Sequence, residues 1–463
     1  MKTKIKKIFI TFSLVFIGIS SLFALTYEEL LQNYCNQDIQ FEELTIAYQQ
    51  AELSYEQTQI NNGFSISAST GAIKLDFDEN QITTSFSPSL NIGIPSLSNT
   101  EATISLPVSV SKDSVSLQNA GISVSTEIIS SSKEKRDLTL EKSLRSLEEA
   151  KRKLEARVVA LEKSFLTELK NLYSLGLSVY EAEENLLSKK ISLESIKLQG
   201  YSETSSKYRS SNLSVKSAEY DLEKATRKYA TTLEKFVNAC DAKDLDIYSL
   251  EIPEVDLLKI SDFEKEKFAA IESTLWSNYT NEKNREAEKD FTLSANASAN
   301  FSQGNEKASS TIGAGLTGAY KGLQGKVNLN LPTDGKTNPS VSFSLSWNPN
   351  QGKLAEINEE LTSLKERQEV ISLKKAYDDY ESTFNEYETE RENLIWQYEK
   401  NTEEVSMYKE LAEDTAFWYK EGIVSESEYR QANMNYAKAL LSLTNSKIEQ
   451  LIYNLNLKSQ FVK

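Results

Sequence analysis

The sequence of 463 residues contains no histidine and only two cysteines, Cys35 and Cys240. Without histidine the chain lacks the most frequent general base and the most frequent metal ligand in proteins. The two cysteines are too far apart in the sequence to read as a zinc motif, and they leave open either one disulfide or two buried thiols. We therefore expect no enzymatic activity, no metal and no cofactor.

The glycine pattern does not supply a nucleotide site either. Gly313, Gly315 and Gly318 form a G-x-G-x-x-G sequence, but they lie in a stretch of alternating residues with no helix behind it. Small residues in curved or exposed strands explain them better. The many paired acids, such as Asp378 and Asp379, lie on long polar segments, where such charges usually decorate a solvated helix face.

Long apolar runs are confined to the first residues of the chain. Four lysines in Met1–Lys7 precede an apolar run from Ile8 to about Ile19, and small residues follow up to Ala24. This layout predicts a cleaved secretory signal over residues 1–24, with an uncleaved anchor as the alternative. The rest of the chain then either is soluble outside the cytoplasm or enters a membrane as a β-barrel. The formal charge of the whole chain, −16, argues against binding nucleic acid.

The remaining chain repeats one order of elements twice, which predicts an α+β fold with an internal duplication. Segments without Gly or Pro and with helical apolar spacing alternate with segments rich in Ser, Thr, Ile and Val in strand-like alternation. The first repeat, residues 25–250, is predicted to contain a helix at 27–60, strands within 64–128, a long helix at 130–207 and a helix at 214–239. The second, residues 251–463, is predicted to contain a helix at 261–289, strands within 291–347, a long helix at 353–420 and a helix at 425–458.

Both long helices carry apolar residues in alternating spacings of three and four, which is the pattern of a coiled-coil seam. The seam of the first helix runs from Leu140 to Phe165, with Lys151 as its polar member. The seam of the second helix consists of Leu354, Ile357, Leu361, Leu364, Gln368 and Ile371. These helices are therefore expected to pack as antiparallel coiled-coil hairpins.

The turns after the two long helices look alike. The second reads Tyr419-Lys-Glu-Gly422-Ile-Val424-Ser425, and the first reads Tyr208-Arg-Ser-Ser211-Asn-Leu213-Ser214. In each, serine is a good N-cap for the helix that follows. Gly422 permits the left-handed conformation that ends the helix before it. The sequence thus predicts one turn at about 208–212 and another at Gly422.

These features together resemble the TolC family of outer-membrane efflux proteins over nearly the whole mature chain. The resemblance is most specific in the segment 417–432, FWYKEGIVSESEYRQA, and in the alanine-spaced AKALLSL that follows at 437–443. The opening LTYEELL at 25–31 and NQDIQ at 36–40 are also similar to the start of such proteins.

The resemblance implies a channel subunit of the outer membrane that exports substrates passively in a tripartite efflux or type I secretion system. It implies a homotrimer in which each copy adds four strands to a twelve-stranded transmembrane barrel in outer-membrane lipid, while the helices form a periplasmic tunnel. The implied partners are a periplasmic adaptor protein and an inner-membrane transporter, with no nucleic acid. The implied residues of the periplasmic tip or gate are Tyr208, Ser211, Tyr419, Gly422 and Glu428.

The sequence departs from the family at several of these positions. Gln431 and Val424 stand where the best-known members have an acid and an arginine, and Ser211 replaces the turn glycine in the first half. There are four candidate strand runs in the first half and three or four in the second, against two per repeat in the family. The competing hypotheses are a periplasmic adaptor protein, which usually has a single hairpin, and a coiled-coil surface protein without a pore.

Overall fold

The computed structural model describes residues 26–462 apart from 79–80, 112–113, 118–119, 243–244, 290, 304–307 and 334–336. The expected signal sequence at 1–24 lies outside the described residues. The chain forms two compact units. Unit 1 consists of the segment that ends at Ile39 together with Arg157–Asp262 and Glu386–Ser459, and unit 2 consists of Gln40–Ala156, Phe263–Asn385 and the C-terminal residues from Gln460. No helix within the described ranges is long and apolar enough to cross a membrane.

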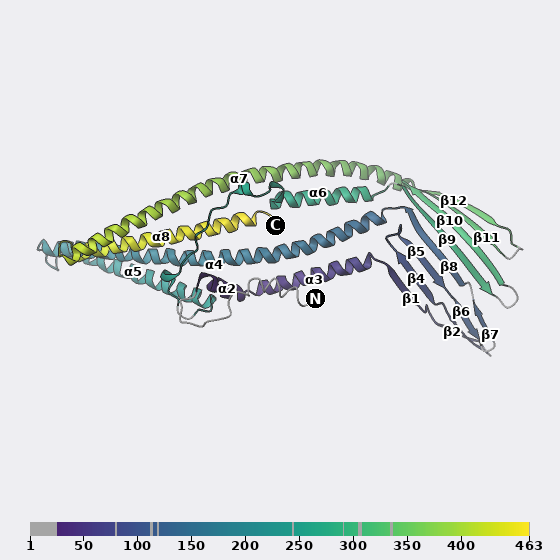
Figure 1. The fold of residues 1–463 in the computed structure, drawn as a ribbon, viewed down its shortest axis with the longest axis horizontal. Helices are drawn as coiled ribbons and strands as arrows, with labels where there is room; N and C mark the ends of the chain where they lie inside the picture. Colours follow the sequence, from purple (N-terminus) through teal and green to yellow (C-terminus); the bar gives the residue numbers. More distant parts are fainter. Residues whose placement is uncertain are drawn as a thin grey trace. The chain divides into compact units, whose positions relative to one another are not determined.

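The described α-helices follow the order that the sequence predicts, with strands between them (Figure 1). They are α2 (Tyr27–Asn36), α3 (Ile39–Asn61), α4 (Ser132–Leu198), α5 (Ser206–Ala239), α6 (Ala269–Ala287), α7 (Pro349–Lys420) and α8 (Glu426–Ser459). Short 3-10 turns lie at Ile247–Ser249, Ile260–Asp262 and Lys265–Lys267. The long helices α4 and α7 each contribute residues to both units.

The core of unit 1 is built around Phe165 of α4, which is fully buried. The Tyr27 and Tyr34 rings of α2 meet the Phe165 ring edge-on, with centroids 5.5 and 5.7 Å away, and Phe236 of α5 lies at 5.5 Å. Ile448 of α8 belongs to the same cluster. Burial of each such side chain contributes about 1.5–3 kcal/mol, so this cluster fixes α2, α5 and α8 to α4.

The single helix predicted at 27–60 is wrong, because the structure breaks it between α2 and α3. Thr26 and Glu29 form a capping box that starts α2, and the helix ends at Asn36. Asp38 then accepts a 3.0 Å hydrogen bond from Nε of Arg157 on α4. Asn36 and Asp38 are weak helix formers whose short side chains compete for backbone hydrogen bonds. The ion pair between Asp38 and Arg157 stabilises the break.

The turn predicted at 208–212 is also wrong: α4 ends at Leu198 and α5 begins at Ser206. Gly200 takes the left-handed conformation with φ +80°, and Ser205 is the N-cap, accepting a 3.3 Å hydrogen bond from the backbone N–H of Tyr208. Ser214, the predicted cap, lies inside α5 and its hydroxyl donates to the carbonyl of Ser210. Gly200 and the capping Ser205 therefore determine where the turn lies, and the similarity of segment 208–214 to segment 419–425 does not.

The second half begins its first helix later than predicted, at Ala269 instead of residue 261. Phe268, just before α6, lies in a small aromatic cluster of unit 2 with Tyr380 and Phe461, at centroid distances of 5.4 and 5.7 Å. The predicted turn at Gly422 is present, with φ +72°, and α7 ends at Lys420 as expected.

Unit 2 contains two antiparallel sheets. The larger one has eight strands in the order β1-β4-β5-β8-β9-β10-β11-β12, and the smaller one has the order β2-β3-β6-β7. The first-half strands are β1 (Ser65–Ser69), β2 (Lys74–Asp78), β3 (Gln81–Phe86), β4 (Ser89–Ile94), β5 (Thr100–Ser105), β6 (Val108–Ser111), β7 (Ser114–Leu117) and β8 (Ala120–Ile129). The second-half strands are β9 (Phe291–Gln303), β10 (Ala308–Tyr320), β11 (Leu323–Pro332) and β12 (Ser340–Trp347).

The expectation of four strands per chain is therefore corrected: the larger sheet takes four strands from each half of the chain. Each first-half run is interrupted and continues into the smaller sheet. Pro88 separates β3 from β4 and Pro107 separates β5 from β6, because proline cannot donate a ladder hydrogen bond. Gly71 has φ +66° between β1 and β2, where a Cβ would come within 2.5 Å of the Ser87 carbonyl oxygen.

Candidate functional site

The eight-stranded sheet has one continuous apolar face. Its register aligns one residue from every strand into a row that crosses the whole sheet, and every member of that row is apolar. The row consists of Ile66, Ile92, Ala102, Val124, Ala297, Ala314, Leu329 and Val341. Because side chains alternate between faces along a strand, the neighbouring row must point to the other side.

That neighbouring row contains only polar or small residues. It consists of Ser67, Asn91, Thr103, Ser123, Ser298, Gly313, Asn330 and Ser340. The only charged side chains in the strands of this sheet are Glu101, Glu127 and Lys326, all in register with the polar face. The sheet therefore has an uncharged apolar face and an opposite face that is polar and nearly neutral.

The apolar face is exposed in this chain. On β12, Phe343, Leu345 and Trp347 have exposed fractions of 77, 75 and 70%. Large apolar patches on a surface mark contact with a membrane or another protein. At the end of the sheet nearest the helices, Phe291 pairs with Tyr320 and Trp347 pairs with Leu323 on the next strand, so three aromatic rings lie at one level.

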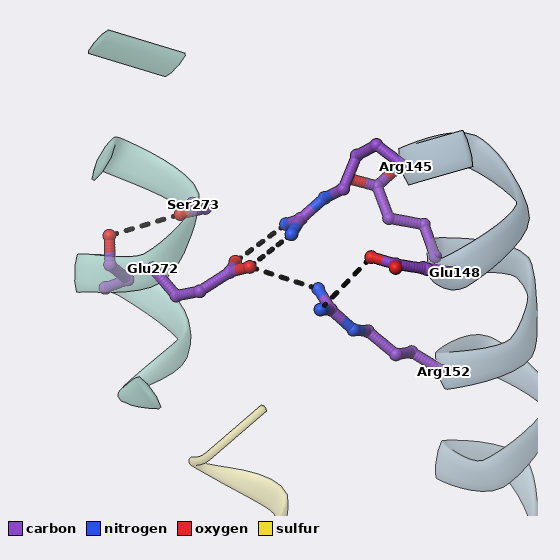
Figure 2. A network of polar contacts seen from close by, with 7 residues as sticks. Arg145, Glu148, Arg152, Glu272 and Ser273 are labelled. Carbon is purple, nitrogen blue, oxygen red and sulfur yellow. Dashed lines mark hydrogen bonds and ion pairs between the residues drawn. The ribbon is translucent and has the colours of Figure 1, made fainter. Parts of the chain in front are cut away.

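The helices of unit 2 are joined by a polar network centred on Glu272 of α6 (Figure 2). Figure 2 shows Arg145 and Arg152 of α4 converging on the Glu272 carboxylate, with Glu148 beside Arg152. Arg145 binds Glu272 through both terminal nitrogens, and its guanidinium also lies 5.3 Å from the Trp276 ring. The hydrogen bonds from Arg145 hold the pKa of the Glu272 carboxyl below its ordinary value despite partial burial.

Further contacts set the order of these helices in unit 2. Thr58 of α3 and Ser143 of α4 are hydrogen-bonded at 3.3 Å. Arg285 of α6 binds Glu369 of α7 at 2.8 Å. Together with the network around Glu272, these contacts give the order α3, α4, α6, α7, which follows the order of the connected strands in the sheet.

The predicted tip residues of the second half come together at the turn between α7 and α8. The Tyr419 ring stacks on the Tyr429 ring with centroids 4.9 Å apart, next to Gly422. Glu428 accepts hydrogen bonds from the backbone N–H of Ser425 at 2.7 Å and from its hydroxyl at 2.8 Å. These bonds lower the pKa of Glu428 and make it the partner of the N-cap of α8.

The predicted tip residues of the first half lie elsewhere than expected. Tyr208 and Ser211 belong to the first two turns of α5 and do not form the turn itself. Sequence reasoning also missed Glu184 of α4, which binds both Gln431 and Lys438 of α8. The hydrogen bond from Lys438 lowers the pKa of Glu184. In the sequence, the only indication of this contact is Gln431, which stands where the best-known members of the family have an acid.

The two cysteines are free thiols in the structure. Of the two alternatives left open by the sequence, the structure therefore has the thiols and not the disulfide. Cys240 is fully buried in the core of unit 1, and Cys35 of α2 is half-buried. Burial raises the pKa of Cys35 to about 11 and that of Cys240 to about 12. Both are therefore weak nucleophiles at neutral pH.

Comparison with known families places both halves of the chain. The model of the TP096X N-terminal domain matches residues 30–253, and the model of the TP096X C-terminal domain matches residues 253–463. This chain belongs to the TP096X family. An uncharacterized protein of Treponema pallidum (strain Nichols) is 24% identical over 310 residues, which are 65% of this TP096X chain and 56% of the relative. The chain thus spans little more than half of that relative's length.

Among solved structures, this TP096X protein is similar to outer-membrane channels. A structure of CusC, described in the context of transmembrane channel formation, is 13% identical and covers 97% of this chain and 95% of its own, with a TM-score of 0.45. The CmeC outer membrane channel of Campylobacter jejuni is 14% identical and covers 97% of this chain and 90% of its own, with a TM-score of 0.41. The resemblance to such channels stated from the sequence is thus found again among solved structures, at values too low to carry a function over.

Proposed function

We propose that this chain is a subunit of an outer-membrane channel that exports solutes passively, as a homotrimer coupled to a periplasmic adaptor protein and an inner-membrane transporter. The observation that carries the proposal is the eight-stranded sheet with its uninterrupted apolar row and the polar row beside it. A transmembrane barrel needs this alternation, because one face meets lipid and the other meets a water-filled lumen. A sheet packed inside a soluble protein would have its apolar face covered.

The dimensions of the sheet support the same proposal. A strand that spans a bilayer at a tilt needs about 9–11 residues, and β9 and β10 have 13 residues each while β11 has 10. Aromatic residues gather at the interfaces of membrane barrels, and Phe291, Tyr320 and Trp347 lie at one level of the apolar face. The small neutral residues of the other face suit an aqueous pore.

The open edges of the sheet argue for several copies in one barrel. β1 and β12 each pair with a single strand of the larger sheet, and unpaired backbone groups are not tolerated in the hydrocarbon core of a membrane. Pairing between copies would satisfy both edges. Three copies with eight strands each would form a barrel of twenty-four strands, which is twice the number that the resemblance implies.

The turn between α7 and α8 supports the coupling to partners. Next to Gly422, Phe417 and Ile423 are 60 and 70% exposed, and apolar residues at a helical tip suit contact with the hairpin of an adaptor. A disturbance of the Tyr419–Tyr429 stack or of the bonds to Glu184 would then open the tip. No bond is made or broken by this chain in that mechanism.

Purification from outer membranes, followed by mass measurement in detergent and planar-bilayer conductance, tests the proposal. We expect a trimer that needs detergent, that conducts ions, and whose mature chain begins at Leu25. A monomer that stays soluble without detergent and does not conduct would refute the channel and favour a periplasmic adaptor or a coiled-coil protein.

A further inference from the structure

Two glycines lie side by side on the apolar face of the larger sheet. Gly318 of β10 pairs with Gly325 of β11, and Leu293 and Leu345 lie next to them on β9 and β12. The rows two residues away on either side contain bulky side chains. Toward the helices the row is Phe291, Tyr320, Leu323 and Trp347, and away from them it is Ala295, Leu316, Val327 and Phe343. The glycine pair thus leaves a gap between two rows of side chains.

The backbone and the packing of the sheet do not require either glycine. Neither Gly318 nor Gly325 takes a positive φ. A Cβ atom added to Gly318 would lie 3.6 Å from its nearest neighbour, Cε2 of Phe291. One added to Gly325 would lie 4.0 Å from Cδ1 of Leu345. Both distances are those of ordinary van der Waals contact, so a larger residue would fit at each position.

Glycine weakens a strand, because it adds backbone freedom and brings no side chain to pack. The sheet alone would be more stable with valine at both positions. Gly315 on the polar face is different, because an added Cβ there would collide with Oδ1 of Asn296. What Gly318 and Gly325 contribute is therefore an open space, and a glycine inside a strand often marks a place of close approach to the backbone.

The open space above the two glycines, the glycine groove, has a volume of about 550 Å³. Gly318 and Gly325 form its floor, Tyr320 lies in the wall nearest the helices, and Leu316 and Phe343 lie in the opposite wall. The side chains that line it from the apolar face are uncharged. Its volume falls within the range of small-molecule sites, about 300–1,000 Å³.

The end of the glycine groove nearest the helices carries two opposite charges. Lys321 follows Tyr320 directly, and its ammonium lies 5.9 Å from the centre of the Tyr320 ring. The same ammonium forms a 2.6 Å ion pair with Glu359 of α7. A cation and an anion thus lie at one end of a groove that is otherwise apolar. This arrangement is complementary to an amphiphile with both charges in its head and an apolar tail.

We propose that the glycine groove binds one acyl chain of a zwitterionic phospholipid, whose headgroup lies beside Lys321 and Glu359. The inference rests on the proposed channel, which places the apolar face in lipid. Aromatic rings of membrane barrels lie at the level of the headgroups, and here that level is marked by Phe291, Tyr320 and Trp347. The glycine pair lies two residues deeper, which is about 7 Å, so a chain that starts at the rings passes over it.

A transmembrane helix fits the glycine groove less well than an acyl chain does. Helices that pack closely in membranes use small residues repeated at intervals of four along the contact, whereas the groove offers a single pair of glycines. The next row, with Leu316 and Phe343, is bulky again. A flexible acyl chain needs only a few methylene groups to fill the gap and gains dispersion contacts with its walls.

Counting of bound lipid on the full-length protein tests the inference. The protein is purified in detergent, phosphatidylethanolamine is added, and native mass spectrometry counts the phospholipids that remain on each chain. We expect one retained phospholipid per chain in the wild type. Gly318→Leu combined with Gly325→Leu fills the groove and should lose it. The matched control is Ala314→Leu, which adds a side chain at an exposed position of the same face of β10 and should retain it.

Two further measurements keep the result interpretable. The thermal midpoint of the double variant without added lipid should be no lower than that of the wild type, because a Cβ fits at both positions. A retained phosphatidylethanolamine with a photoreactive diazirine on its acyl chain should label residues 316–327 or 343–345. It should leave Ile66 and Ile92 unlabelled, which lie in the apolar row of the same sheet on β1 and β4.

Four results would overturn the inference: equal retention by all three proteins, a wild type that retains no phospholipid, labelling spread evenly over the apolar face, or a lower midpoint of the double variant, which would mean that the glycines serve the fold. Retention of anionic phosphatidylglycerol in preference to phosphatidylethanolamine would overturn the headgroup assignment. Conductance is measured separately. A protein that conducts without retaining phospholipid refutes the groove and leaves the channel standing, whereas one that retains phospholipid but does not conduct refutes the channel and supports the groove.

Discussion

Replacing Val327 by arginine should destabilise the membrane-inserted protein far more than the same replacement at Asn328. Val327 lies in the middle of β11 on the apolar face, opposite Leu316 and Phe343. Asn328, the next residue, faces the other way, opposite Gly315 and Ser342. The two variants therefore place an identical charge at nearly one depth on the two faces of the sheet.

An arginine on the lipid face near the midplane of a bilayer costs about 2–4 kcal/mol, which lowers the folding equilibrium about 30- to 900-fold. On a lumen face the guanidinium keeps its water. Asn328→Arg loses a 3.4 Å hydrogen bond to Ser342. We expect the free energy of unfolding to fall by about 2–4 kcal/mol in Val327→Arg and by less than about 1 kcal/mol in Asn328→Arg.

The assay is urea-induced unfolding from lipid vesicles, followed by tryptophan fluorescence. Equal losses in both variants would refute the assignment of the faces. A larger loss for Asn328→Arg would show that the sheet faces lipid with its polar side, and the reasoning behind the proposed channel would fail with it.

Three further predictions concern the helices. Glu272→Gln should lower the free energy of unfolding by about 1–3 kcal/mol. Because Arg145 lowers the pKa of Glu272, this advantage of the wild type is present above the ordinary pKa of about 4.3 and is lost as the pH falls through the lowered pKa. Urea titrations at pH 7 and at successively lower pH values would show the loss. Gly422→Ala should cost about 1–2 kcal/mol, since φ is +72°, and a fall in the thermal midpoint would detect it. Ser205→Ala should lower the free energy of unfolding by about 1 kcal/mol because it removes an N-cap, whereas Ser214→Ala should leave it nearly unchanged. A lower denaturation midpoint for Ser214→Ala than for Ser205→Ala would instead favour the turn predicted from the sequence at 208–212.

Much of the helical architecture could be predicted from the sequence, because the apolar periodicity of a long helix repeats over many turns. The end of α7 and the left-handed Gly422 were readable from local chemistry. The break after Asn36 was not, because it depends on an ion pair between Asp38 and Arg157, residues more than a hundred positions apart. The turn lies before 208–212 because Gly200, which adopts the left-handed conformation, ends a helix more strongly than the residues of segment 208–214 do.

The strand regions were harder, because short strands carry little periodic signal. Alternation revealed that strands exist, but their pairing depends on register, which no single strand encodes. The capping role of Glu428 was hidden for another reason: a carboxylate three residues after a serine fits both a capping box and the gate residue that the family suggests. The bonds to Ser425 show the capping role, whereas the gate role stays a prediction.

Each half of the chain gives four strands to the larger sheet. This equal number was not evident from the sequence, where the first half has more and shorter strand-like runs. β9 and β10 run for 13 residues without interruption, whereas the first-half runs are cut by Gly71, Pro88 and Pro107. Each cut falls between a segment of the larger sheet and a segment of the smaller one, so these residues end the shared sheet and do not disrupt it. Proline within a central strand would cost a ladder hydrogen bond, yet at this border it lets the strand leave the sheet. The larger number of short runs in the first half is therefore the same four-strand plan with a second sheet attached.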